Sequence, residues 1–186
     1  INVGNLAENC WFLANEDTKE AVVIDPGAEP DRICATAEKH GWKITAILLT
    51  HGHIDHMGAC ESLRTELGVK VYALTEEEDL LLDAKKNLSV FIERKVVTFE
   101  PDELLRDGQE LTLAGMKIQV IHTPGHTPGG CSYYVADAGC VFSGDTLFAE
   151  SVGRSDFPGG STSALVRAVK EKLFLLPDDT LVCPGH

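Results

Sequence analysis

The sequence has few basic residues for its length. Its 186 residues include 16 lysines and arginines against 29 aspartates and glutamates, so the formal net charge is -13 at pH 7. A charge of this sign repels the phosphates of nucleic acids and anionic membrane surfaces. No local basic patch is evident either. The sequence therefore predicts no nucleic-acid or membrane partner.

Long hydrophobic runs are also missing. No stretch approaches the roughly 20 apolar residues of a transmembrane helix, and no signal-peptide pattern opens the chain. The six cysteines show no pair at metal-ligand spacing, and a domain of this size does not need disulfides. They are Cys10, Cys34, Cys60, Cys131, Cys140 and Cys183. We therefore expect a cytoplasmic protein with reduced thiols.

Length and composition fit one domain. The 44% hydrophobic and 24% charged residues are ordinary for a globular protein, and 186 residues can bury a sizeable core. Because no linker or low-complexity segment interrupts the chain, we predict a single domain over residues 1–186.

A histidine-rich stretch from Thr50 to Gly58 carries the strongest signal. His51 and His53 are two residues apart, so in extended backbone their imidazoles point to the same side and can reach one ion. Asp55 and His56 follow where the chain turns into a predicted helix, and they could serve a second ion. Burying so many polar side chains without a partner cation would cost too much desolvation energy. The stretch therefore predicts a metal-binding loop.

Three further candidates lie singly in the second half of the chain. His126 lies in a loop rich in proline and glycine, Asp145 follows a strand and a glycine, and His186 follows Pro-Gly after the last predicted strand. Taken singly, each could be a loop residue or a helix cap. Together they are better explained as parts of one site. We interpret His122 as a core or supporting residue and His40 as a surface helix residue.

The pattern of elements predicts an α/β fold in two similar halves. A charged segment, 75–87, is predicted to be a helix, with acidic residues in its first turn and lysines in its last to match the helix dipole. The acidic segment 100–107 is predicted to be a loop. The two halves, each with strands and helices, predict two mixed sheets packed face to face with helices outside.

Four motifs together resemble a known family. They are His51-Gly52-His53-Ile54-Asp55-His56, Thr123-Pro124-Gly125-His126-Thr127-Pro128-Gly129, Ser143-Gly144-Asp145-Thr146-Leu147-Phe148 and Pro184-Gly185-His186. In this order and at these separations they look like the metallo-β-lactamase fold hydrolases, and most like the short glyoxalase II-like branch. The loop 153–160 also resembles one found in that branch. An aspartate at position 145 argues against the true β-lactamases of the fold.

The resemblance implies a four-layer αββα sandwich with a dinuclear metal site between its halves. By motif, His51, His53 and His126 would hold the first ion, and Asp55, His56 and His186 the second. Asp145 would bridge both. Nitrogen and oxygen ligands without thiolates suit zinc, our first expectation, and also iron or manganese. Glyoxalase II itself has a further C-terminal helical domain that helps bind glutathione, whereas this sequence ends at His186.

The implied reaction is hydrolysis of a small-molecule thioester. Two ions about 3.5–4 Å apart would lower the pKa of a bridging water from ~15.7 to about 7, and the hydroxide would attack the acyl carbon. Asp55, besides binding metal, could orient this nucleophile. No serine or cysteine triad competes, because Ser143-Gly144-Asp145 lacks the nucleophile-elbow pattern.

An oxidoreductase is the alternative. Persulfide dioxygenases share this fold and hold a single iron with two histidines and one aspartate, which here would be His51, His126 and Asp145. All three are present, so the sequence permits this function.

Substrate contacts are predicted on the loop after Asp145. Phe148, Arg154 and Phe157 could line the cleft, and Arg154 could bind a carboxylate of the substrate. The alternative is that Arg154 pairs with a structural acid such as Asp156. The sequence does not indicate the oligomeric state.

Overall fold

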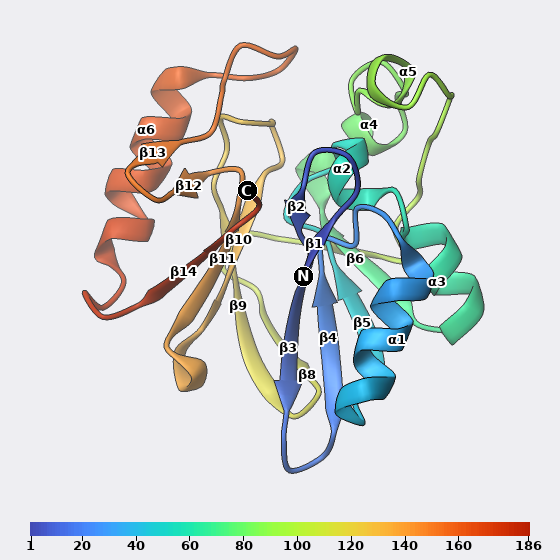
Figure 1. Cartoon of the computed structure of the whole chain (residues 1–186). Coiled ribbons are helices and arrows are strands. Elements are labelled where there is room, and N and C mark those ends of the chain that lie inside the picture. The colour runs from blue at the N-terminus through green and yellow to red at the C-terminus, as the bar shows by residue number, and fades with distance from the viewer.

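The fold is a four-layer sandwich, seen here in a computed structural model that describes all residues 1–186. Figure 1 shows two sheets face to face, with helices α1 and α3 outside the N-terminal sheet and helix α6 outside the C-terminal sheet. This architecture confirms the αββα fold class expected from the alternation of strands and helices.

The N-terminal sheet has the strand order β3-β4-β5-β6-β7. β3 runs antiparallel to β4, and the strands from β4 to β7 run parallel. The bounds are β3 Trp11–Asn15, β4 Glu20–Ile24, β5 Lys43–Leu48, β6 Lys70–Leu74 and β7 Glu103–Leu105. The apolar run of β4 is buried on both faces, as expected for an inner strand of a covered sheet.

Two predicted elements of this half differ in the structure. The segment 100–107 is not entirely a loop, because Leu105 is buried and the chain around it pairs with β6 as an edge strand. The helix predicted over 75–87 stops early: a 3₁₀ helix, η1 (Thr75–Glu77), and α4 (Glu78–Leu81) are followed by a turn. Asp83 explains this end, since its carboxylate accepts hydrogen bonds from the backbone N–H groups of Lys85 and Lys86.

The C-terminal sheet has the order β14-β11-β10-β9-β8. Its strands pair antiparallel except β11 and β14, which run parallel. The bounds are β8 Glu110–Leu113, β9 Met116–His122, β10 Cys131–Val135, β11 Cys140–Gly144 and β14 Leu181–Pro184. A turn at Ala114-Gly115 joins β8 to β9, and both residues have positive φ, as a tight hairpin requires.

Helices and short strands complete the chain. The main helices are α1 Pro30–His40, α2 Ile54–Met57, α3 Cys60–Leu67, α5 Ser89–Ile92 and α6 Thr162–Glu171. The shorter elements are β1 Asn2–Val3, β2 Glu8–Asn9, η2 Ala136–Ala138, β12 Leu147–Phe148, β13 Ser151–Val152 and η3 Leu173–Leu175. α1 begins with Pro30 and ends before Gly41, whose left-handed conformation closes the helix.

Three apolar clusters hold the layers together. One fills the space between the sheets, with Ile24 and Leu48 from the N-terminal sheet and Val120 and Tyr133 from the C-terminal sheet. A second packs α1 and α3 against the N-terminal sheet, and a smaller third packs α6 and η3 against β11. The loops at one end of both sheets can therefore be held close together. None of the helices combines the length and the apolar composition that a membrane-spanning helix requires.

Candidate metal centre

The histidine-rich loop follows the C-terminal end of β5. Asp25, at the end of the neighbouring β4, fixes its start: one carboxylate oxygen accepts the backbone N–H of Thr50 at 2.7 Å, and the other accepts the Thr50 hydroxyl at 2.5 Å. At the far side, the backbone N–H of Ile54 donates to the carbonyl of the buried Asn87 at 2.9 Å. The loop is thus tied to the sheet at one end and to the α4–α5 segment at the other.

A first group of ligand atoms comes from three buried histidines, His51, His53 and His126. These atoms lie within 4.8 Å of one another, and His126 Nε2 is 3.0 Å from His53 Nδ1. Burial lowers the pKa of all three, that of His53 to about 3. The imidazoles are therefore neutral, which is the form that binds a metal ion.

A second group consists of Asp55, His56 and His186, whose ligand atoms also lie within 4.8 Å of one another. Burial alone would disfavour a proton on His56, but the carboxylates of Asp145 and Asp25 raise its pKa well above the usual value. For His186, a hydrogen bond to Asp55 raises the pKa. The same carboxylates that stabilise a proton here would stabilise a metal cation.

Asp145 lies between the two groups. Its Oδ2 is 3.6 Å from His126 Nε2 in the first group and 3.7 Å from His186 Nε2 in the second, and its Oδ1 is 3.5 Å from His56 Nε2. Gly185 allows this approach, since a Cβ there would overlap Asp145 Oδ1 and His56 Cε1. The structure thus brings together all seven predicted metal-ligand residues.

Unsatisfied polar atoms test whether these residues fit metal ions. His51 Nε2, His56 Nε2 and Asp145 Oδ1 are buried and have no hydrogen-bond partner. Buried polar atoms are normally paired, so these atoms are arranged for a partner other than a protein group. Nitrogen and oxygen donors converging in this way suit divalent ions such as zinc, iron or manganese.

In two of these imidazoles, the Nδ1 atom contacts an oxygen atom of the protein. Asp25 Oδ2 lies 3.0 Å from His56 Nδ1, and the backbone carbonyl of Arg154 lies 2.7 Å from His126 Nδ1. Such contacts fix the ring orientation and leave Nε2 for the metal. His122 belongs to neither group, and its Nε2 lies 2.8 Å from the Pro128 carbonyl.

Sequence reasoning missed three buried acidic residues around the loop: Asp25, Glu8 and Glu77. Asp25, in Asp25-Pro26-Gly27, has the sequence context of a residue that only ends a strand. Glu8 Oε1 lies 3.8 Å from His56 Nδ1, and burial raises the pKa of Glu8 to about 10. Glu77 lies in the acidic first turn of the helix predicted over 75–87, yet it is only 1% exposed. Its position three and four residues before the apolar Leu80 and Leu81 is the signal that could have placed it on the inner face.

Of the predicted substrate residues, Phe157 and Phe148 flank the site. The Phe157 ring is 5.6 Å from the His53 ring, and the Phe148 ring is 6.5 Å from the His186 ring. Arg154 instead makes two hydrogen bonds to Asp156, at 2.7 and 2.8 Å, with its guanidinium 3.9 Å from the Phe157 ring centre. In this structure Arg154 therefore has the structural partner considered as the alternative.

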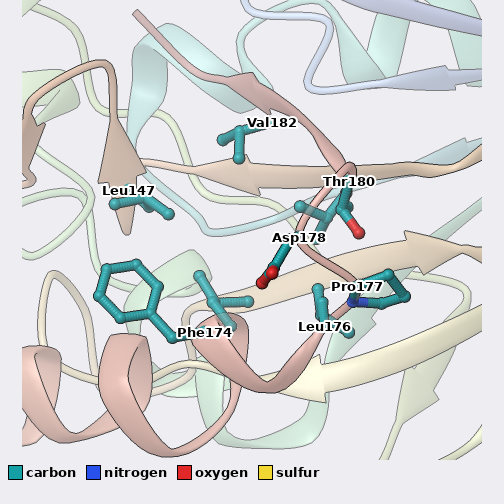
Figure 2. A pocket seen from close by; sticks show the side chains of 9 residues that line it. Leu147, Phe174, Leu176, Pro177, Asp178, Thr180 and Val182 are labelled. Atoms are coloured by element: carbon teal, nitrogen blue, oxygen red, sulfur yellow. The ribbon is translucent and has the colours of Figure 1, made fainter.

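A large apolar cavity lies apart from the metal ligands. It measures about 400 Å³ and is lined from β11, β14 and the η3 region, with no ligand histidine among its residues. Figure 2 shows Leu147, Phe174, Leu176 and Val182 around it. None of the converging donor atoms of the histidine cluster belongs to the residues that line this cavity.

Named relatives resemble the chain over nearly its whole length. It is 40% identical to the probable metallo-hydrolase YqgX of Bacillus subtilis, over 99% of this chain and 87% of that protein. It is 34% identical to the hydroxyacylglutathione hydrolase GloC of Haemophilus influenzae, over 100% of this chain and 88% of that protein.

Solved structures agree with this. The structure of BLEG-1 B3 metallo-beta-lactamase matches with a TM-score of 0.94 and 38% identity, covering 100% of this chain and 90% of that one. TTHA1623 in a di-iron-bound form matches with a TM-score of 0.88 and 37% identity, over the same shares. Residues 3–186 match the family described as the metallo-beta-lactamase superfamily. The chain belongs to the metallo-β-lactamase superfamily.

Proposed function

We propose that this protein is a metal-dependent hydrolase of the glyoxalase II-like branch that cleaves thioesters such as S-lactoylglutathione. The position of Asp145, within 3.7 Å of ligand atoms from both groups, is the observation that carries the proposal. A two-ion site of this kind suits hydrolysis of an acyl group. The 34% identity to a hydroxyacylglutathione hydrolase supports the thioester class.

Each group of ligands would hold one divalent ion. His51, His53 and His126 would bind the first, Asp55, His56 and His186 the second, and Asp145 both. The similarity to TTHA1623 in a di-iron-bound form supports two ions and leaves iron as an alternative to zinc. When bound, such ions lower the pKa of water from ~15.7 to about 7 and polarise the substrate carbonyl.

Protein groups would orient the reactants. Burial opposes ionisation of Asp55, but hydrogen bonding to His186 and the surrounding imidazoles lower its pKa, so Asp55 is ionised and can accept a hydrogen bond from the nucleophile. Phe148 and Phe157 would contact the acyl group on either side. The leaving thiolate needs little acid help, which fits a site with no general acid assigned.

A thiol carrier with a carboxylate, such as glutathione, is the more specific part of the proposal. A substrate carboxylate could bind Arg154 by displacing Asp156, an exposed partner that is held weakly. Six free cysteines support a reducing, cytoplasmic location.

Thioester assays with matched controls test the function. We expect the purified protein to hydrolyse S-lactoylglutathione or another small acyl thioester, to lose this activity with a chelator and to regain it with zinc. A β-lactam is the control substrate, and we expect it to be cleaved more slowly. Absence of cleavage of any thioester by metal-loaded protein would contradict the proposal.

The alternative is a mononuclear iron persulfide dioxygenase. The 3.6 Å distance between His126 Nε2 and Asp145 Oδ2, with His51 beside them, favours it, because these are the three residues such a site would use. The completeness of the second group argues for the hydrolase. Oxygen consumption on glutathione persulfide by protein with one iron, together with no thioester cleavage, would establish the dioxygenase.

A further inference from the structure

Glu77, the last residue of η1, connects two loops that belong to different halves of the fold. Its Oε1 accepts a hydrogen bond from the backbone N–H of Gly52 at 2.9 Å. Its Oε2 accepts one from the backbone N–H of Gly129 at 2.7 Å. All three groups are buried, and no lysine or arginine pairs with the carboxylate. The two amides are therefore its main partners.

The two glycines flank the first ligand group. Gly52 separates His51 from His53 after β5, and Gly129 lies three residues after His126 in the loop between β9 and β10. One carboxylate thus joins the backbone of the loop that supplies two of these histidines to that of the loop that supplies the third.

Close packing makes this contact specific. A Cβ at Gly129 would overlap the backbone of Glu76 and Glu77, and a Cβ at Gly52 would lie within 3 Å of the side chains of Leu80 and Leu81. Both loops therefore approach the η1–α4 segment as closely as a backbone can. A carboxylate with two oxygens can accept from two amides at once, which a side-chain amide cannot do.

We propose that Glu77 is a positioning residue that sets the geometry of the three-histidine group by fixing its two loops to each other. The inference rests on the metal-dependent function proposed above. Glu77 makes no hydrogen bond to a ligand side chain, and it acts through the two backbone amides. Without Glu77, the position of His126 relative to His51 and His53 would change. The second ligand group is not linked to Glu77 in this way.

Cobalt binding to the metal-free protein tests the inference. We would titrate wild type, Glu77→Gln and Glu77→Asp with Co²⁺, following heat and the visible spectrum. Glutamine keeps one acceptor and places an amino group against the second amide. Aspartate keeps the carboxyl group, but its shorter side chain cannot reach both loops. His53→Ala and His186→Ala identify which binding step belongs to which group.

Asp102→Asn is the matched control. The Asp102 carboxylate also accepts a backbone N–H, from Val71 at 2.8 Å, but in an element that carries no ligand. We expect the Glu77 variants to weaken cobalt binding at the three-histidine group about 10- to 100-fold, to change its visible spectrum and to leave the second group near wild type. Asp102→Asn should leave both steps unchanged.

Two results would overturn the inference. One is wild-type cobalt binding and an unchanged spectrum in both Glu77 variants. The other is a loss that affects both groups equally and follows the drop in melting temperature of the metal-free protein, which would make Glu77 a general stabiliser. If Glu77→Gln does not fold, Glu77→Asp decides by the same criteria. Because the readout is cobalt binding, a failure of thioester hydrolysis would not be mistaken for a failure of this inference.

Discussion

The two halves of the molecule contribute to the site in different ways. The N-terminal half supplies four candidate ligands within the six residues from His51 to His56, all in or next to one loop. The C-terminal half supplies His126, Asp145 and His186, each from a different loop. The N-terminal part of the site therefore depends on the structure of one loop. The C-terminal part depends on the correct pairing of the strands that carry three separate loops.

The register on the C-terminal side is visible in β11 and β14. Gly144 pairs with Pro184 across these parallel strands, and the N–H of Gly185 donates to the carbonyl of Gly144 at 2.9 Å. Asp145 and His186, 41 positions apart in sequence, are therefore neighbours because of strand pairing. We therefore expect substitutions in either half to weaken binding of the same metal ions, in the first half by changing one loop and in the second by changing strand pairing.

Replacing the residue that both ligand groups share should have the largest effect. We expect Asp145→Ala to reduce thioesterase activity at least about 1,000-fold, equal to about 4 kcal/mol of transition-state stabilisation, because the carboxylate lies between both groups. Steady-state kinetics with metal in excess would measure it. Full activity in this variant, with metal retained, would contradict the two-ion site.

Single histidines from each half provide the direct comparison. His53→Ala and His126→Ala each remove one ligand from the same group. His53 comes from the histidine-rich loop of the N-terminal half, and His126 comes from the C-terminal half. We expect both to weaken the same metal-binding step by at least about 10-fold, since the ion needs both nitrogens. Calorimetric titration of the metal-free variants would show it. Effects on different binding steps would separate these histidines into different sites.

A tyrosine that links the halves should affect stability more than chemistry. The hydroxyl of the fully buried Tyr133 in β10 donates to the carbonyl of Leu49, just before the histidine loop, at 2.6 Å. We expect Tyr133→Phe to lower the free energy of unfolding by about 1–3 kcal/mol, because a buried hydrogen bond is lost. Urea denaturation of the metal-free protein would measure the change. A variant as stable as wild type would show that this link contributes little.

The exposed loop after Asp145 should give the smallest effect. If Arg154 binds the substrate, Arg154→Ala should raise the Michaelis constant several-fold with little change in turnover, since lost ground-state binding acts on that constant. Stability should hardly change, because the pair with Asp156 is exposed. Asp156→Ala, which frees the guanidinium, is the matched control. An unchanged Michaelis constant in Arg154→Ala would remove Arg154 from the site.

The same difference between the halves explains what could be predicted from sequence. The dense loop was recognisable because four metal-binding side chains within six residues have no ordinary structural explanation. His126, Asp145 and His186 were ambiguous one by one and became convincing only through the motifs around them. Their convergence depends on the pairing of β11 with β14 and on the packing of two sheets, which no local pattern contains.

The supporting carboxylates could not be identified in this way. Asp25 resembles a residue that ends a strand, and Glu77 resembles one of several acids in the first turn of a helix. Only the folded chain reveals that Asp25 accepts a hydrogen bond from Thr50 and lies beside His56. It also reveals that Glu77 accepts hydrogen bonds from two loops. The early end of the predicted helix over 75–87 has a similar origin, since the side chain of Asp83 competes locally with helical hydrogen bonds.

Metal content per chain tests the central claim most directly. Elemental analysis would be made on protein purified without chelator, beside Asp145→Ala prepared in the same way. The two ligand groups and the carboxylate between them predict close to two ions per chain in the wild type and a clear loss in the variant. One ion per chain after incubation with excess zinc, unchanged by Asp145→Ala, would contradict the account.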